Sequence, residues 1–187
     1  MADLATVDDL AAFVQSPLDP ADPSPALYLS IASGMVRDYL QQDITQTVDD
    51  VVYCDPIDGA YVMLDQLPVA AVSLLETTAD GATWTAADPT TYTVSRRLGM
   101  IAAKPGCGVQ WPSDPESWRV TYTHGYATVP DTIKAVCLGV AARGYSSPVG
   151  IDMERVGQRQ VKYALESAGF SGIELAALAR YKVARIA

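Results

Sequence analysis

The chain has 187 residues, of which 49% are hydrophobic, and a formal net charge of −9 at pH 7. This length and apolar content suit one buried core, or one core with a small inserted subdomain, and they argue against disorder. No run of about eighteen apolar residues occurs, and the acidic start MADLATVDDL lacks the basic and apolar regions of a signal peptide, so we expect no membrane partner.

Cysteine and histidine are too scarce for most metal sites. Cys54, Cys107 and Cys137 are far apart in the sequence, no CxxC pair occurs, and His124 is the single histidine. A structural zinc site needs four such ligands close together, so we expect no metal and no cofactor. Reduced, structural cysteines in a protein made in the cytoplasm are the better interpretation.

The charge is unevenly distributed along the chain. Residues 1–150 carry 18 acidic and 7 basic side chains, whereas residues 151–187 carry 4 acidic and 6 basic ones. The acidic body argues against general nucleic-acid binding. The basic C-terminal segment suits contact with an acidic partner surface.

Two helices are predicted near the N-terminus, a short one from residue 6 and a longer one over 25–41, with a Pro- and Asp-rich loop at 16–25. Thr6, Asp8 and Asp9 are typical of a helix start and predict the beginning of the first helix. For the second helix, Ser24 is the predicted cap and Pro25 the first helical residue. The longer helix has a broad apolar face, which indicates contact on more than one side, either with the core and a neighbouring subunit or with a monomeric core alone.

From residue 49 to residue 123 the pattern changes to short antiparallel strands. The predicted strands are 51–54, 61–64, 72–77, 83–85, 92–95, 100–103 and 118–123. In the last of these, Trp118, Val120 and Tyr122 alternate with polar residues, which is typical of a half-buried strand. The segment DPIDG (55–59) predicts a hairpin turn between Tyr53 and Tyr61 rather than a calcium loop, because further oxygen ligands at regular spacing are missing.

The remaining sequence predicts a helix opened by Pro130, an isolated strand over 158–163 and a final helix over 173–186. The predicted fold class is therefore α+β: a small helical bundle with an inserted antiparallel β subdomain and a C-terminal arm and helix. We assign all 187 residues to one domain. Its predicted parts are a helical core at 1–48 and 124–150, a β insertion at 49–123, and the arm and helix at 151–187.

No catalytic set is evident in the sequence. His124 beside a glycine is more typical of a turn or strand end than of a general base, and Cys107 lies in a Pro/Gly-rich loop at 104–117 with nothing to tie it to His124. No phosphate-binding glycine loop or G-x-S-x-G motif occurs. Trp111 in that loop, if exposed, would suit contact with another protein.

The order of elements resembles that of the head–tail connector (adaptor) proteins of long-tailed double-stranded-DNA bacteriophages. The matching segments, in chain order, are VDDLAAFV, ALYLSIASGMVRDYL, VTYTHGY, VPDTIKAVCLGVAARGYSSP, ERVGQRQVKYA and IELAALARYK. They span nearly the whole chain, and it is their order that carries the resemblance.

The resemblance implies a non-enzymatic virion protein that forms a ring, typically of twelve subunits, beneath the portal vertex. Such a ring joins the head to the tail, extends the channel through which genomic DNA passes without specific binding, and contacts the portal protein and a stopper or tail-terminator protein. The C-terminal segment of the family reaches the portal, so the basic residues there are the candidate portal contacts: Arg155, Arg159, Lys162, Arg180 and Arg185. The candidate subunit-interface residues are Ile31, Met35, Val136, Val140, Leu175, Leu178 and Tyr181.

Two other functions stay open from the sequence. One is a minor tail or head-completion protein that binds another virion component without forming this ring. The other is a small cysteine hydrolase that uses Cys107 and His124.

Overall fold

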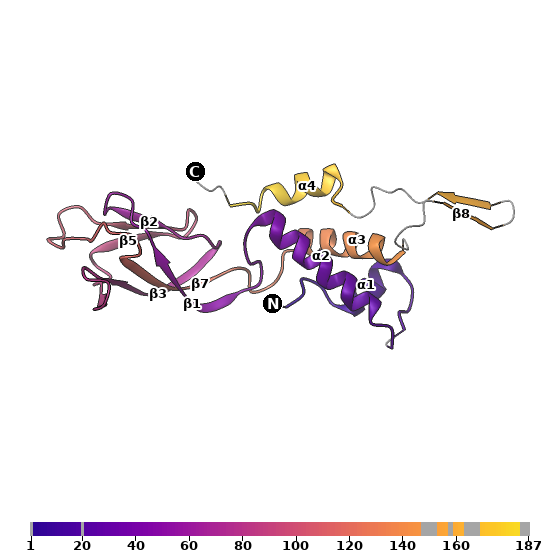
Figure 1. Cartoon of the computed structure of the whole chain (residues 1–187), viewed down its shortest axis with the longest axis horizontal. Coiled ribbons are helices and arrows are strands. Elements are labelled where there is room, and N and C mark those ends of the chain that lie inside the picture. The colour runs from indigo at the N-terminus through magenta and orange to yellow at the C-terminus, as the bar shows by residue number, and fades with distance from the viewer. Residues whose placement is uncertain (1, 20, 147–152, 157–158, 163–168, 184–187) are drawn as a thin grey trace. The chain divides into compact units, whose positions relative to one another are not determined.

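The computed structural model describes residues 2–19, 21–146, 153–156, 159–162 and 169–183. Within them it has four helices and antiparallel sheets, which is the predicted α+β class (Figure 1). The chain divides into two compact units. We call the described residues of 1–41 and 129–182 the helical unit, and those of 42–128 together with residue 183 the β unit.

Helix α1 (Val7–Val14) begins with a reciprocal pair of hydrogen bonds. The Thr6 hydroxyl accepts the amide of Asp9 at 3.2 Å, and the Asp9 carboxylate accepts the amide of Thr6 at 2.9 Å. This capping box satisfies amides that the first helical turn leaves without a partner. The helix start predicted at Thr6 is confirmed.

Helix α2 (Ser24–Leu40) starts differently from the prediction. Pro23 holds the cap position, no side chain caps the helix, and Ser24 is already helical. The amide of Ser24 donates instead to the Asp22 carboxylate at 2.9 Å. The predicted cap at Ser24 is therefore wrong, because an acidic side chain two residues earlier already accepts this amide.

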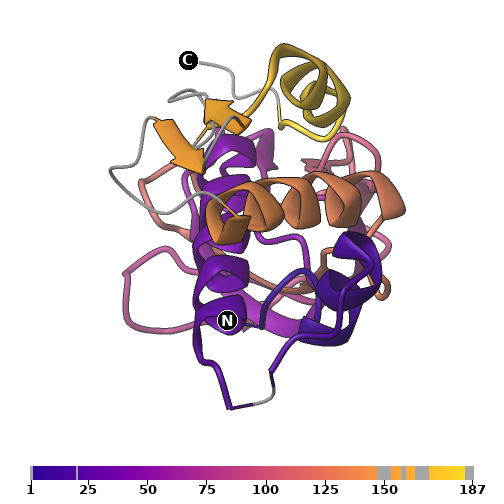
Figure 2. The same ribbon diagram turned by 90° about the vertical axis from the view of Figure 1, so that its right-hand side faces the viewer.

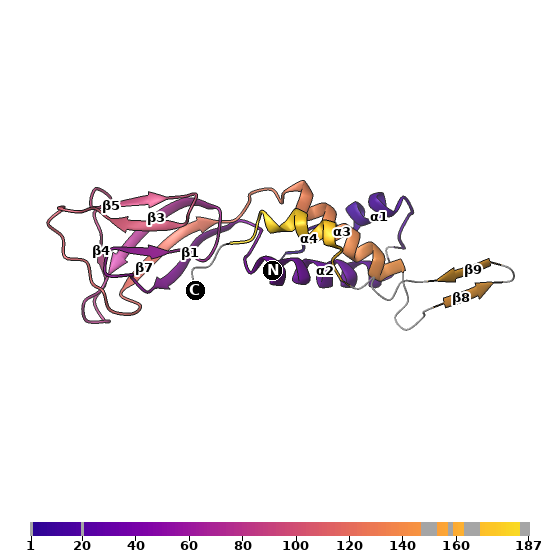
Figure 3. The ribbon, with the colours of Figure 1, turned by 90° about the horizontal axis from the view of Figure 1, so that it is seen from above.

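Helix α3 (Asp131–Ser146) is the centre of the helical unit, with α1 and α2 on either side of it (Figure 3). Five buried residues at helical spacing form its inner face: Ile133, Val136, Cys137, Val140 and Ala141. Near the end of α3, Gly144 allows close packing against α2, since a Cβ there would lie 2.7 Å from the Tyr28 ring. The same contact includes an edge-on pair of Tyr28 and Tyr145, whose ring centroids are 6.4 Å apart.

Helix α4 (Gly172–Ala179) packs on α3, as the view in Figure 2 also shows. It is shorter than the predicted helix over 173–186, because Tyr181 and Lys182 donate to carbonyls three residues back instead of continuing the α-helical pattern. Leu178 is fully buried, so α4 contributes to the core of the helical unit.

Strands β8 (Met153–Val156) and β9 (Arg159–Lys162) pair antiparallel as a hairpin, with Val156 opposite Arg159. The prediction of an isolated strand at 158–163 is wrong in this respect, since β9 has a partner strand immediately before it in the sequence.

The β unit contains two antiparallel sheets, of order β1-β7-β3-β4 and β2-β6-β5. The strands are β1 (Thr47–Cys54), β2 (Tyr61–Met63), β3 (Val69–Thr77), β4 (Thr85–Ala86), β5 (Tyr92–Ser95), β6 (Met100–Ala103) and β7 (Trp118–His124). Trp118, Val120 and Tyr122 on β7 are fully buried, as their alternation predicts. They share one apolar cluster with residues of the other sheet, among them Val62 on β2 and Ile101 on β6.

The DPIDG turn does not join a hairpin. Strand β1 pairs with β7 and strand β2 pairs with β6, so the chain changes sheet between them. The turn closes locally instead, where the Ile57 amide donates to the Tyr61 carbonyl at 2.8 Å. The predicted pairing across Tyr53 and Tyr61 is therefore wrong, because β7, far away in the sequence, pairs with β1.

Candidate interaction surfaces

The predicted subunit-interface residues lie in three different environments. Val136, Val140 and Leu178 are buried inside the helical unit. Met35, Leu175 and Tyr181 are half-buried. Ile31 on α2 is 48% exposed, so it is the one of the seven with a largely free apolar side chain.

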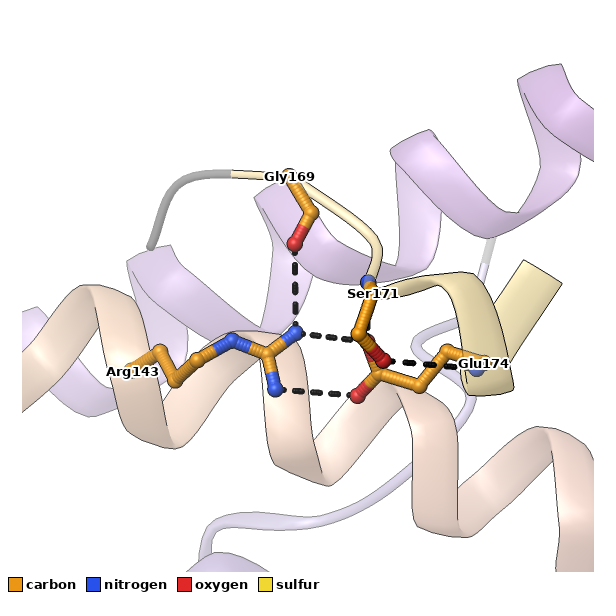
Figure 4. Close-up of polar contacts among 4 residues, drawn as sticks. All are labelled: Arg143, Gly169, Ser171 and Glu174. Atoms are coloured by element: carbon orange, nitrogen blue, oxygen red, sulfur yellow. Dashed lines mark hydrogen bonds and ion pairs between the residues drawn. The ribbon is translucent and has the colours of Figure 1, made fainter. Parts of the chain in front are cut away.

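A polar anchor holds α4 on α3 (Figure 4). The two terminal nitrogens of Arg143 donate to the two carboxylate oxygens of Glu174, both at 2.9 Å, and Nη2 also donates to the Gly169 carbonyl at 3.2 Å. Glu174 closes a capping box with Ser171, whose amide donates to the carboxylate at 2.7 Å. A two-point arginine–carboxylate pair fixes geometry as well as charge.

The sequence around this anchor leaves space for it. A Cβ on Gly139 would lie 3.1 Å from Glu174 Oε1, so the glycine on α3 admits the carboxylate. Burial raises the pKa of Glu174, but the hydrogen bonds from Arg143 and Ser171 lower it by more, so the net pKa is below the usual range. Glu174 is thus held as a carboxylate, and the anchor is ionic near neutral pH.

The candidate portal contacts lie on different elements of the fold. Arg155 lies on β8, and Arg159 and Lys162 lie on β9, so the hairpin carries three of the five by position. Arg180 is exposed just after α4 and donates to the Thr132 hydroxyl at 2.6 Å. Arg185 lies outside the described residues.

Trp111 is half-buried, and its contact with another protein stays a prediction. The centroid of its ring lies 4.6 Å from that of the Trp118 ring. Its ring also packs edge-on to Tyr92, with the centroids 6.4 Å apart. The loop that carries it therefore folds back onto the core of the β unit. Its neighbours Gln110 and Pro112 line a groove of about 640 Å³ with the turn that joins β3 and β4.

Two carboxylates line this groove, Asp80 and Asp114, and that of Asp80 is hydrogen-bonded within its own turn. Asp80 accepts the amides of Ala82 and Thr83 at 2.9 and 2.7 Å and the hydroxyls of Thr78 and Thr83 at 3.0 Å each. The backbone amides and hydroxyls lower the pKa of Asp80. Asp80 therefore organises the turn rather than acting as an acid or base.

The two residues of the hydrolase hypothesis lie on different parts of the β unit, one in a strand and one in a loop. His124 is buried at the end of β7, and its Nε2 lies 3.2 Å from the Asp50 carboxylate. Cys107 lies in the loop at 104–117, and among the described residues it forms no hydrogen bond with His124. Burial raises the pKa of another cysteine, Cys54, to about 12, so this thiol stays protonated. In the described part of the chain no group of His, Cys, Asp or Glu is arranged to hold a metal ion.

The β unit also carries a polar and aromatic cluster that was not predicted from the sequence. Arg119 on β7 forms an ion pair with Glu76 on β3, with Nη2 2.7 Å from the carboxylate. Its guanidinium carbon lies 4.5 Å from the centre of the Trp84 ring, which also packs edge-on to Tyr53 at 5.6 Å. The alternation of strands 51–54 and 118–123 was the available signal, because Tyr53 and Arg119 occupy the positions that face away from the core.

None of the helices described in the structure is long and apolar enough to span a membrane. No protein-family model matches the chain, and no curated protein matches it.

Three solved structures contain chains with a similar fold. The chain aligns with one in the neck of an empty GTA particle computed with C6 symmetry, at 16% identity and a TM-score of 0.60, over 98% of this chain and 92% of that chain. It also aligns with a chain in the neck of a native GTA particle computed with C12 symmetry, at 15% identity and a TM-score of 0.59. This alignment covers 100% of this chain and 96% of that chain. A third match, in the virion of a native gene transfer agent (GTA) particle, has 14% identity and a TM-score of 0.61. It covers 98% of this chain and 92% of that chain.

At this identity the matches establish the fold, and they cover nearly all of both chains. The chain therefore has the fold of a protein found in the neck of gene transfer agent particles, in agreement with the resemblance to head–tail connector proteins that its sequence predicts.

Proposed function

We propose that this protein is a structural component of the head–tail junction of a phage-like particle, where it forms a ring, joins the head to the tail and extends the DNA channel. The observation that carries the proposal is the full-length fold match to neck chains, one of them in a neck computed with C12 symmetry. A ring of twelve copies is the matching assembly. A role without catalysis fits a chain whose single histidine pairs with Asp50 inside the β unit.

The charge of the chain supports a channel function. Eighteen acidic and seven basic side chains in residues 1–150 give a negative body, which offers few cations to release counterions from DNA phosphates. Genomic DNA passes such a wall without specific binding. The tail-side partner in this proposal is a stopper or tail-terminator protein.

The β8–β9 hairpin is the proposed contact with the portal protein. It carries Arg155, Arg159 and Lys162 within two short paired strands, which concentrates positive charge in an otherwise acidic chain. A two-stranded hairpin alone is marginally stable in water, so a partner surface would also stabilise it. Arg185 belongs to the same basic segment of the sequence.

Native mass spectrometry and negative-stain microscopy of the purified chain, alone and mixed with portal protein, test the proposal. A closed ring, or a ring on the portal, is the expected result. A persistent monomer that ignores the portal would contradict it and would favour the minor tail or head-completion function.

Replacing Arg155, Arg159 and Lys162 with serine tests the portal contact. We expect portal affinity to fall at least about tenfold and to lose part of its salt dependence, because charged contacts between proteins are screened by salt. The matched control replaces three basic residues of the β unit that are exposed, Arg96, Arg97 and Lys104. Equal losses in both variants would argue against a hairpin contact.

A further inference from the structure

The outward face of α2 carries apolar side chains that the helical unit leaves exposed. Leu27 is 58% exposed and Ile31 is 48% exposed, whereas Leu29, Ala32 and Val36 on the opposite face are buried. At helical spacing the same outward face continues through Gly34 to Asp38, which is exposed.

The described residues of the subunit do not account for a glycine at position 34. It lies in the middle of α2, where glycine weakens a helix relative to alanine. A Cβ built on it would meet none of the described residues within 4 Å, so none of these requires its small size. A glycine at such a position allows the close approach of another chain.

The outward face of α4 has the same pattern with the opposite charge. Ile173 is 85% exposed, and Ala176 and Arg180 are exposed on the same side of the helix, away from buried Leu178. The spacing is identical on the two helices: an isoleucine, a small residue three positions later and a charge four positions after that. On α2 the residues are Ile31, Gly34 and Asp38, and on α4 they are Ile173, Ala176 and Arg180.

We propose that α2 of one copy packs parallel to α4 of a second copy, as one contact of the ring. Ile31 then lies against Ile173, Gly34 against Ala176, and Asp38 against Arg180. The small pair lets the two backbones approach, and the charge pair sets the register. This inference rests on the ring assembly proposed above.

Two features make a second copy the fitting partner. Both matching faces point outward from one helical unit, so a single subunit cannot bring them together. A contact between two different faces of identical subunits is heterologous, and such contacts generate closed rings when the rotation closes.

Arg180 is available for this contact although it has partners in its own subunit. Nη2 of Arg180 donates to the Thr132 hydroxyl at 2.6 Å and to the Tyr181 hydroxyl at 2.8 Å. The guanidinium has five donor hydrogens in all, so others remain for a further partner. Among the described residues Asp38 forms no ion pair of its own. The proposal replaces the portal contact predicted for Arg180 from the sequence.

Reversing each of the two charges singly, and then both in the same chain, is the decisive experiment. Asp38→Arg and Arg180→Asp are each expected to raise the protein concentration needed for half-assembly by about tenfold or more, because like charges then face each other. The double variant is expected to restore assembly. Two controls should assemble as wild type: Asp8→Arg, which reverses the charge of an exposed residue on α1, and Thr132→Val, which removes one of the contacts of Arg180 within its subunit.

The outcomes separate this inference from the proposed function. If wild type forms no ring, alone or with portal, the proposed function fails and the contact fails with it. If wild type forms rings and the single variants assemble equally well, or the double variant stays as defective as the singles, the contact is overturned while the ring stands.

Gly34→Leu gives a second test that does not depend on charge. The side chain has open space in the subunit and leucine favours helix, so thermal stability of the unassembled protein should be unchanged or higher. Assembly should be lost, because the larger side chain holds the two helices apart. Normal rings from this variant would overturn the contact.

Discussion

Among the described glycines of the β unit, Gly125 lies closest to another part of the backbone. Its φ is +80°, its amide donates to the Pro68 carbonyl at 3.0 Å, and a Cβ would lie 2.5 Å from the Thr45 carbonyl oxygen. The contact is with backbone, which cannot move aside as a side chain can. The turn after β7 therefore requires glycine for both its dihedral angle and its space.

Gly125→Ala should destabilise the β unit by about 3 kcal/mol, since the strain of a left-handed backbone adds to a steric clash. Gly81→Ala is the matched control, because Gly81 also has a positive φ of +72° but would meet nothing within 4 Å. It should cost about 1 kcal/mol. Urea unfolding followed by tryptophan fluorescence measures both, and equal losses would refute the close approach.

Asp9 joins the cap of α1 to α3. Its carboxylate lies 2.7 Å from Lys134 Nζ, with the two side chains 29% and 35% exposed. The hydrogen bond from Lys134 and those from Thr6 lower the pKa of Asp9 from 3.8 to about 2. Because the folded state lowers this pKa, the carboxylate stabilises the fold above a pH of about 4, and the contribution is lost as the pH falls towards about 2.

Asp9→Asn should therefore lower the free energy of unfolding by about 1 kcal/mol at pH 7. The difference from wild type should shrink between pH 4 and pH 2, where Asp9 becomes protonated in the wild type. Asp8→Asn, in the same first turn, should have a smaller effect. Urea titrations at pH 7, 4 and 3 provide the measurement, and a difference independent of pH would contradict the assignment.

At the scale of elements, α4 depends on α3 for its stability. It has only eight residues, which is too short for a helix to persist alone in water. Its capping box, its buried Leu178 and the Arg143–Glu174 pair all tie it to the helical unit. Removing the whole segment after residue 150 would thus uncover part of this core as well as delete the hairpin.

Arg143→Gln should release α4, because Glu174 then loses its two-point partner in a half-buried position. A cost of about 1–2 kcal/mol is expected. Hydrogen exchange of the amides in residues 175–179 should accelerate by about tenfold, since 1.4 kcal/mol corresponds to a factor of ten. Exchange in β7 should stay unchanged, and uniform acceleration in both units would argue against a local anchor.

At the scale of the whole molecule, the chain builds two units with separate cores. Among the described residues, the buried members of the apolar cluster of the β unit lie between Cys54 and Tyr122, and Val52 packs against them. All three tryptophans, Trp84, Trp111 and Trp118, lie in this unit, whereas the four helices belong to the other. Tryptophan fluorescence therefore reports on the β unit, and helical circular dichroism reports on the helical unit.

A fragment of residues 42–128 should fold by itself and keep the tryptophan emission of the full chain. Its sheets close within the fragment, since β1, β3 and β7 pair with one another and β2, β5 and β6 pair with one another. Emission spectra and urea unfolding of fragment and full chain provide the comparison. Emission typical of solvent-exposed tryptophan in the fragment would show that the β unit needs the helices.

Sequence alone determined the local features, because each is encoded by residues close together in the chain. The Thr6–Asp9 cap, the alternation of Trp118, Val120 and Tyr122, and the buried face of α3 follow from spacing and short-range hydrogen bonding. The α+β class and the resemblance in element order follow from the sum of such features.

Tertiary structure decided what depends on residues far apart in the chain. Three contacts join segments that no local pattern connects. They are the pairing of β1 with β7 instead of β2, the packing of Trp111 on Trp118, and the anchor of α4 on Arg143. The matching faces of α2 and α4 became visible for the same reason: only packing of the helical unit reveals which side of each helix is left exposed.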